Sequence, residues 1–410
     1  MLNRSVVSCS CACSLLAGAF ALSSATVTFA SKPVSNIEGR VPPALNAPQP
    51  APTDGPVVQL ALLLDTSNSM DGLIDQARAQ LWSVVNEMSA MQQDCEPVQL
   101  QVALFQYGND GLEGADGYIE LRTPFTTDLD ILSEQLFSLR TNGGSEFCGQ
   151  VIQQAADGLG WIEPNNDPDA PTITRMIVIA GNEPFTQGTT PYQSAIPSAT
   201  NKGIAVHTVF CGPKQEGINT FWRDGATLGE GRYCAIDHNK SVVEIETPYD
   251  KVISRLNVDL NATYIRFGAE GEIYERRQAL QDSVNYDSAP SMAASRTNAK
   301  ASGLYNNRLW DLVDASKEAD FDLDSIERDS LPEHLQGLTS DELQKAIDTA
   351  SVTRVQIQTE IKKSYAERKK YIAEHQGEKN AKGTLEAVLL DAINEAMTSD
   401  DSGDSEPADH

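Results

Sequence analysis

Residues 57–70 read Val-Val-Gln-Leu-Ala-Leu-Leu-Leu-Asp-Thr-Ser-Asn-Ser-Met, and this stretch decides the fold. Its first part is too continuously apolar for a strand with one wet face and suits the middle of a parallel sheet. The chain then changes to Asp65-x-Ser67-x-Ser69. A carboxylate and two hydroxyls at this spacing can converge from one tight loop as oxygen ligands, which suit Mg²⁺, Ca²⁺ or Mn²⁺ better than Zn²⁺. Ligand sites in open parallel sheets lie at the carboxyl ends of strands, so this loop is the predicted site.

Helical and strand patterns alternate regularly after this stretch. Apolar residues recur at helical spacing in several segments between residues 71 and 260, and short apolar or alternating runs separate these segments. The predicted strands cover residues 98–104, 118–121, 176–180, 204–210 and 233–236. Strands that alternate with helices of this length indicate an α/β fold, here a three-layer, doubly wound, mostly parallel sheet of Rossmann-like type.

The loop after the first strand carries a family resemblance. Asp65, Ser67 and Ser69, between a buried strand and an amphipathic helix, resemble the metal-ion-dependent adhesion site (MIDAS) of von Willebrand factor type A (VWA) domains. The order of elements over residues 57–264 is also similar to that family. The resemblance implies a bound divalent cation, with Mg²⁺ the first choice and Ca²⁺ or Mn²⁺ the alternatives. It also implies a protein partner whose acidic side chain completes the coordination.

The other two loops of the resemblance depart from the family pattern. The hydroxyl of the second loop falls on Ser145, where Thr is more usual, and the third loop reads Ala180-Gly181-Asn182 in place of Thr-Asp-Gly. The usual Asp is therefore absent, which predicts weak metal binding by the free protein and tighter binding after Gly181→Asp. Glu146 or Glu183 could supply the missing carboxylate. Alternatively, Glu146 is an acid in the first turn of its helix and Glu183 a solvated loop residue.

The ends of the chain are predicted to lie outside the folded part. Residues 1–30 carry one positive charge and an apolar run that ends in small residues, as in a secretory signal peptide, and the Pro-rich residues 31–56 are typical of a linker. The polar, acidic residues 399–410 are typical of a disordered tail. We therefore expect an exported protein that is periplasmic, attached to the cell envelope or secreted, without an integral membrane span after signal cleavage.

Export would also place the remaining cysteines in an oxidising compartment. Removal of the signal peptide leaves Cys95, Cys148, Cys211 and Cys234. An even number in an oxidising compartment permits disulfides. Cys148 and Cys211 should both lie at the metal end of the sheet, so we predict a bridge between them. Four buried thiols are the alternative.

Residues 265–398 are predicted to form a helical region with no resemblance to a known family. A helix over 271–283 has Ile273 and Leu280 as candidate buried positions, and residues 285–303 favour a loop or a weak helix. Thr339 and Glu342 form a capping box ahead of a long helix that extends to about His375.

The net charge and the absence of catalytic motifs exclude several classes of function. The net charge of −27 disfavours nucleic acid as a partner. We find no nucleophile elbow, zinc-protease motif or phosphate-binding loop, so an enzyme is not expected. Asp237-His238 is the remaining candidate for a hydrolase. The sequence favours an exported binding or adhesion-type protein that captures a protein partner through a cation. The alternative is a structural or assembly VWA protein with a degenerate metal site.

Overall fold

The computed structural model describes residues 55–90, 92–93, 96–163, 165, 170–237, 245–375, 385 and 389–393. The predicted signal peptide and disordered tail, the predicted linker up to residue 54, Cys95 and His238 lie outside the described residues. Among the described residues, no helix is long and apolar enough to cross a membrane.

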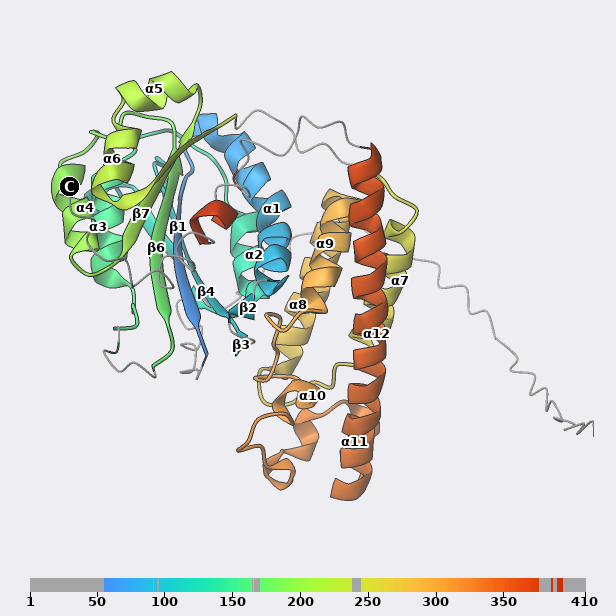
Figure 1. Cartoon of the computed structure of the whole chain (residues 1–410). Coiled ribbons are helices and arrows are strands. Elements are labelled where there is room, and N and C mark those ends of the chain that lie inside the picture. Colours follow the sequence, from blue (N-terminus) through green and yellow to red (C-terminus); the bar gives the residue numbers. More distant parts are fainter. Residues whose placement is uncertain are drawn as a thin grey trace, which may run out of the picture. The chain divides into compact units, whose positions relative to one another are not determined.

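Six strands form the central sheet, and their order confirms the predicted α/β fold. The strands are β1 (Val57–Asp65), β4 (Gln99–Tyr107), β5 (Ile119–Thr126), β6 (Ile173–Gly181), β7 (Ala205–Cys211) and β8 (Glu230–Ile236). They are arranged β5-β4-β1-β6-β7-β8, and every neighbouring pair is parallel except β4 and β5 (Figure 1). The continuously apolar β1 therefore lies at the centre, as its sequence predicts. A separate pair joins β2 (Gln92–Gln93) to β3 (Glu96–Pro97).

Helices cover both faces of the sheet, which gives the three layers. On one side lie α1 (Asp71–Ala90) and α2 (Leu129–Ser138), and the other side holds α3 (Cys148–Gly158), α4 (Tyr192–Thr200), α5 (Lys214–Asn219) and α6 (Trp222–Leu228). Alternate residues of β1 enter the two cores. Leu60 and Leu62 pack on the α1 side, whereas Ala61 and Leu63 pack on the α3 side.

The C-terminal part is helical, as predicted for the region after residue 264. Its helices are α8 (Gly271–Ser288), α9 (Pro290–Lys300), α10 (Leu312–Ala315), α11 (Glu333–Gln336) and α12 (Ser340–His375), and α7 (Asp250–Asn261), which lies within the predicted VWA range 57–264, precedes them. Short 3₁₀ turns are η2 (Asn68–Met70), η3 (Gly114–Asp116), η4 (Leu323–Ser325) and η5 (Arg328–Ser330). The predicted capping box is present: Glu342 accepts from the Thr339 backbone, and Thr339 accepts from the Glu342 backbone. The long helix begins and ends where the sequence indicated.

The helix α7 belongs to this helical layer. Ile253 packs with Ala294 of α9 and Tyr365 of α12, and Leu260 packs with Ala301 and Ile361. The chain's last described residues instead join the core on the α1 side of the sheet. Leu385, Leu389, Ala392 and Ile393 are almost completely buried there. In Figure 1 the end of this segment is the short red helix drawn near β1 and α2.

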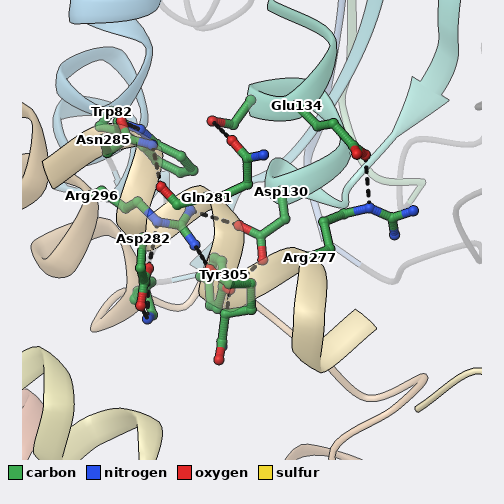
Figure 2. A network of polar contacts seen from close by, with 12 residues as sticks. Trp82, Asp130, Glu134, Arg277, Gln281, Asp282, Asn285, Arg296 and Tyr305 are labelled. Atoms are coloured by element: carbon green, nitrogen blue, oxygen red, sulfur yellow. Dashed lines mark hydrogen bonds and ion pairs between the residues drawn. The ribbon is translucent and has the colours of Figure 1, made fainter. Parts of the chain in front are cut away.

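A buried polar network joins α8 and α9 to α1 and α2 (Figure 2). Arg296 donates to Asp282 at 2.7 Å and to Asp130 of α2 at 2.6 Å, and its guanidinium lies 4.7 Å from the ring centre of Trp82 in α1. The Trp82 indole in turn donates to Asn285 at 2.7 Å. These contacts fix α8 and α9 against α1 and α2, which lie far from them in the sequence.

This network corrects two predictions about the helical region. Ile273 and Leu280 are exposed, at 45 % and 53 %, whereas the buried positions of α8 are polar: Gln278, Gln281 and Asn285. The inward face of α8 is polar because it meets hydrogen-bonding side chains on α1, α2 and α9. Residues 290–300, predicted as a loop or a weak helix, form the regular and largely buried helix α9.

Candidate metal site at the carboxyl edge of the sheet

Three neighbouring parallel strands end at one edge of the sheet and bring the predicted loops together. Asp65 is the last residue of β1, and β1 lies between β4 and β6. The loop that follows β4 begins at Gly108, and the loop that follows β6 begins at Asn182. The backbone of Asn68 donates to the Gly143 carbonyl at 2.9 Å, which fixes the first loop against the segment that contains Ser145 and Glu146.

Asp65 is completely buried at this edge. Its Oδ1 accepts from the Ser67 backbone at 2.7 Å, and Oδ2 has no hydrogen-bond partner. Burial raises the pKa of Asp65 to about 7, although hydrogen bonds from Ser67 oppose the shift. The Ser67 and Ser69 hydroxyls lie 3.3 Å apart, so the carboxylate and both hydroxyls converge as the sequence predicted.

Glu146 lies beside Asp65. A Cβ atom at Gly108 would lie 2.6 Å from Glu146 Cγ and 2.9 Å from Asp65 Oδ1, so both side chains contact this glycine. A Cβ atom at Gly144 would lie 2.8 Å from Glu146 Oε1 and 3.2 Å from the Ser67 Cβ. Glu146 is buried, and its Oε2 has no hydrogen-bond partner. Its side chain thus lies among the loop residues rather than in solvent.

Asn182 is a member of the cluster that sequence reasoning missed. Its side-chain amide donates to the Ser69 hydroxyl at 3.0 Å, and its buried Oδ1 has no hydrogen-bond partner. The signal that could have found it is its position: it directly follows β6, which pairs with β1 at the centre of the sheet. An amide oxygen at such a strand end is as suitable for a hard cation as a hydroxyl.

The other two predicted ligands, Glu183 and Ser145, lie at the edge of the cluster around Asp65. Glu183 is half-buried, and its charge is one of the causes that raise the pKa of Asp65. Gln187 links the two loops, because its amide donates to Glu183 at 3.2 Å and its oxygen accepts from the Glu146 backbone at 3.1 Å. Ser145 is half-exposed in the second loop, between Gly144 and Glu146.

The space beside Gly181 contradicts the prediction for Gly181→Asp. A Cβ atom there would lie 2.5 Å from the Tyr107 hydroxyl, 3.1 Å from the Trp222 ring and 3.2 Å from the Asp65 Cβ. The Tyr107 hydroxyl is fixed, since it donates to the Ala180 carbonyl at 3.0 Å. The third loop therefore has no room for the usual Asp, and the two aromatic side chains occupy its place.

The donor set fits a hard cation. Three buried oxygens lack a hydrogen-bond partner and come from three loops: Asp65 Oδ2, Glu146 Oε2 and Asn182 Oδ1. Unpartnered buried acceptors are rare, and an ion that neutralises them removes the cost. Among the described residues, no group of three or more His, Cys, Asp or Glu side chains is arranged to hold a metal. A cation here would rest on two carboxylates and several neutral oxygens.

The predicted disulfide is wrong in this structure. Cys148 and Cys211 are buried free thiols. Both lie near the metal edge, as predicted, but Cys148 packs in the core on the α3 side of the sheet and Cys211 in the core on the α1 side. The sheet separates them. Burial raises the pKa of the Cys148 thiol well above its usual value.

The strand order, the antiparallel edge strand β5 and the Asp-x-Ser-x-Ser loop after β1 define a VWA-like domain. Among solved structures, the chain is similar to the conserved hypothetical protein BatB from Bacteroides thetaiotaomicron, at 17 % identity over 44 % of this chain and 90 % of that one, with a TM-score of 0.33.

Two further solved structures are similar to this chain. The SpRpn10 VWA domain matches at 13 % identity over 45 % of this chain and 98 % of its own, with a TM-score of 0.30. The pilus adhesin SpaC from Lactobacillus rhamnosus GG matches at 13 % identity over 45 % of this chain and 28 % of its own, with a TM-score of 0.32. No family model matches the sequence, and no curated protein matches it. At these identities the similarity is one of fold alone.

Proposed function

We propose that this chain is an exported binding protein whose VWA-like domain captures a protein partner through a divalent cation. The observation that carries the proposal is the set of three unpartnered buried oxygens, on Asp65, Glu146 and Asn182, beside the Ser67 and Ser69 hydroxyls. Mg²⁺ is our first choice because it tolerates sites that keep several waters, and Ca²⁺ and Mn²⁺ are the alternatives. When bound, the ion would supply positive charge and open positions for an acidic side chain of the partner.

Each protein residue would have a distinct task. Asp65 and Glu146 would provide negative charge, and Ser67, Ser69 and Ser145 neutral oxygens. Within the cluster, the hydrogen bond from Asn182 orients Ser69. Outside it, Gln187 holds Glu183 and the Glu146 backbone together. In this proposal Glu146 takes the role of the Asp that Gly181 replaces, and Glu183 contributes charge from the margin.

Metal titration of purified protein tests the first half of the proposal. We expect Asp65→Ala to abolish Mg²⁺ and Mn²⁺ binding in calorimetry, and Glu146→Gln to weaken it at least tenfold, while circular dichroism stays unchanged. Asp75→Ala is the matched control: it removes an exposed carboxylate that pairs with Arg78 on α1. Equal metal affinity of Asp65→Ala and the parent protein would refute the site.

Partner capture is tested separately. Immobilised protein is incubated with an envelope extract in Mg²⁺ and then washed with or without a chelator. We expect proteins that elute with the chelator from the parent and do not bind to Asp65→Ala. Proteins retained equally by both would show that capture does not depend on the cation.

A structural or assembly role with a degenerate metal site is the second candidate. It is favoured by one observation: Tyr107 and Trp222 fill the place of the usual Asp beside Gly181. Retention of the partner by Asp65→Ala, together with loss of metal binding, would support this candidate over the first.

A further inference from the structure

Phe221, between α5 and α6, combines backbone strain with exposure to solvent (Figure 1). Its φ is +74°, in the left-handed region, which is a strained conformation for a bulky side chain. Glycine is the usual residue where a helix such as α5 ends in this conformation, because it has no Cβ atom to clash. The residue is also 48 % exposed. The fold therefore keeps a large apolar side chain in water at a cost in backbone energy.

The residues on both sides of Phe221 maintain this conformation. The Thr220 carbonyl accepts from the Phe185 backbone at 3.0 Å. Trp222 is completely buried, and its indole donates to the Glu183 carbonyl at 2.7 Å. Because both neighbours are hydrogen-bonded to the loop after β6, the backbone at residue 221 has little freedom to relax.

The same contacts place Phe221 at the edge of the sheet that carries the candidate metal site. The loop to which both of its neighbours bond also contains Asn182. The Trp222 ring lies 3.1 Å from the position of a Cβ atom at Gly181, and the Asp65 Cβ lies 3.2 Å from the same position. Trp222 therefore connects Phe221 directly to the surroundings of Asp65.

Phe221 also differs from other exposed apolar residues. Within the described residues up to 237, the exposed large hydrophobic side chains are those of Phe221 and Leu228. Leu228 ends α6 next to Glu230, where β8 begins, and so lies toward the amino edge of the sheet. A single exposed apolar side chain is common on protein surfaces, but one held in a strained conformation points to a function.

We propose that Phe221 is the apolar contact of the partner-binding surface. This inference rests on the proposed function, in which an acidic side chain of the partner coordinates the cation. An apolar side chain close to that acid in the partner's sequence would then pack on the Phe221 ring. Aromatic side chains at the centre of an interface often supply much of the binding energy. The partner's binding segment is thus expected to pair an acidic residue with a nearby aliphatic or aromatic one.

Glycine variants of the full chain separate binding from folding. Phe221→Gly removes the ring and the strain together, so the unfolding temperature should stay the same or rise while binding weakens. Glu230→Gly is the matched control. Glu230 also has a positive φ, +52°, and is exposed, but it begins β8 at the opposite edge of the sheet. Its replacement should leave binding unchanged.

Synthetic fluorescent peptides are the probe. Each contains one Asp and one Leu separated by a Gly-Ser spacer of varied length, and a second series carries Ala in place of Leu. Binding to the full chain in Mg²⁺ is measured by anisotropy. For at least one spacer, we expect Leu to tighten binding to the parent protein about tenfold relative to Ala. Phe221→Gly should abolish this gain and leave the affinity for the Ala peptide and for Mg²⁺ unchanged.

The outcomes distinguish this inference from the proposed function. Equal Mg²⁺-dependent binding of the Leu and Ala peptides at every spacer would overturn the role of Phe221 and leave the cation site intact. An equal gain from Leu in Phe221→Gly and in the parent would also overturn it. Peptide binding that Asp65→Ala retains in full would instead refute capture through the cation, and this inference with it.

Discussion

Replacing Arg296 by Met should destabilise the protein strongly, because it removes the cation that two buried carboxylates share. Arg296 is 1 % exposed and contacts Asp282 at 2.7 Å and Asp130 at 2.6 Å. Removing one partner of a buried ion pair typically costs about 3–5 kcal/mol. Lys300 still pairs with Asp282, so the uncompensated charge is chiefly that of Asp130. We therefore expect a loss of about 3 kcal/mol, at the lower end of this range.

Urea denaturation, followed by circular dichroism and by tryptophan fluorescence, measures this loss. Trp82 reports directly on the interface, because Arg296 lies over its ring. The matched control is Arg276→Met, which removes an exposed pair with Glu272 on the outer face of α8 and should cost about 0.5 kcal/mol or less. If both variants lost the same small amount, the buried network would not hold the helical region to the VWA-like domain.

Three other predictions follow from the same contacts. Gly181→Asp should lower the unfolding temperature and leave metal affinity no higher than that of the parent, since Tyr107 occupies the space; tighter binding in calorimetry would contradict this. Thiol titration in denaturant should find Cys148 and Cys211 unpaired in exported protein, and peptide mapping that joins them would contradict it. Burial alone would raise the pKa of Asp282, but Lys300 and Arg296 hold it well below its usual value. Its stabilising effect is therefore present above about pH 4 and lost as the pH falls further, so the stability deficit of Asp282→Asn should shrink in acid.

The strands of the sheet could be predicted from the sequence because β1, β6 and β7 are buried on both faces and are therefore mostly apolar. The convergence of Asp65, Ser67 and Ser69 follows from their place after a buried strand and from the rule that ligand sites lie at the carboxyl ends of parallel strands, whereas the apolar pattern does not give the order of the strands in the sheet. Glu146 could be proposed but not ranked above Glu183, since only the close approach of Gly108 and Gly144 brings its side chain to the centre.

Two features of the structure could not be predicted from the sequence. The face toward which Cys148 and Cys211 point depends on the register of a helix and a strand, which the sequence fixes only to within a residue or two. The buried face of α8 was also hidden, because it consists of Gln278, Gln281 and Asn285, which carry no apolar periodicity. Apolar periodicity indicates which residues face a core. A buried interface of polar side chains, whose hydrogen-bond partners are far away in the sequence, shows no such periodicity.

The late return of the chain to the sheet affects the order in which the protein can fold. Leu60 is among the first residues of the domain to be synthesised, and Leu389 packs in the same core. Loop closure over such a distance adds only slowly to the entropic cost, but contacts of this kind slow folding and expose apolar surface until they form. A nascent chain therefore passes through a stage in which the six-stranded sheet can already pair with α1 and α2 in place, while the part of this core that Leu389 covers is still exposed. That apolar surface stays exposed to water until Leu385 and Leu389 have packed against it.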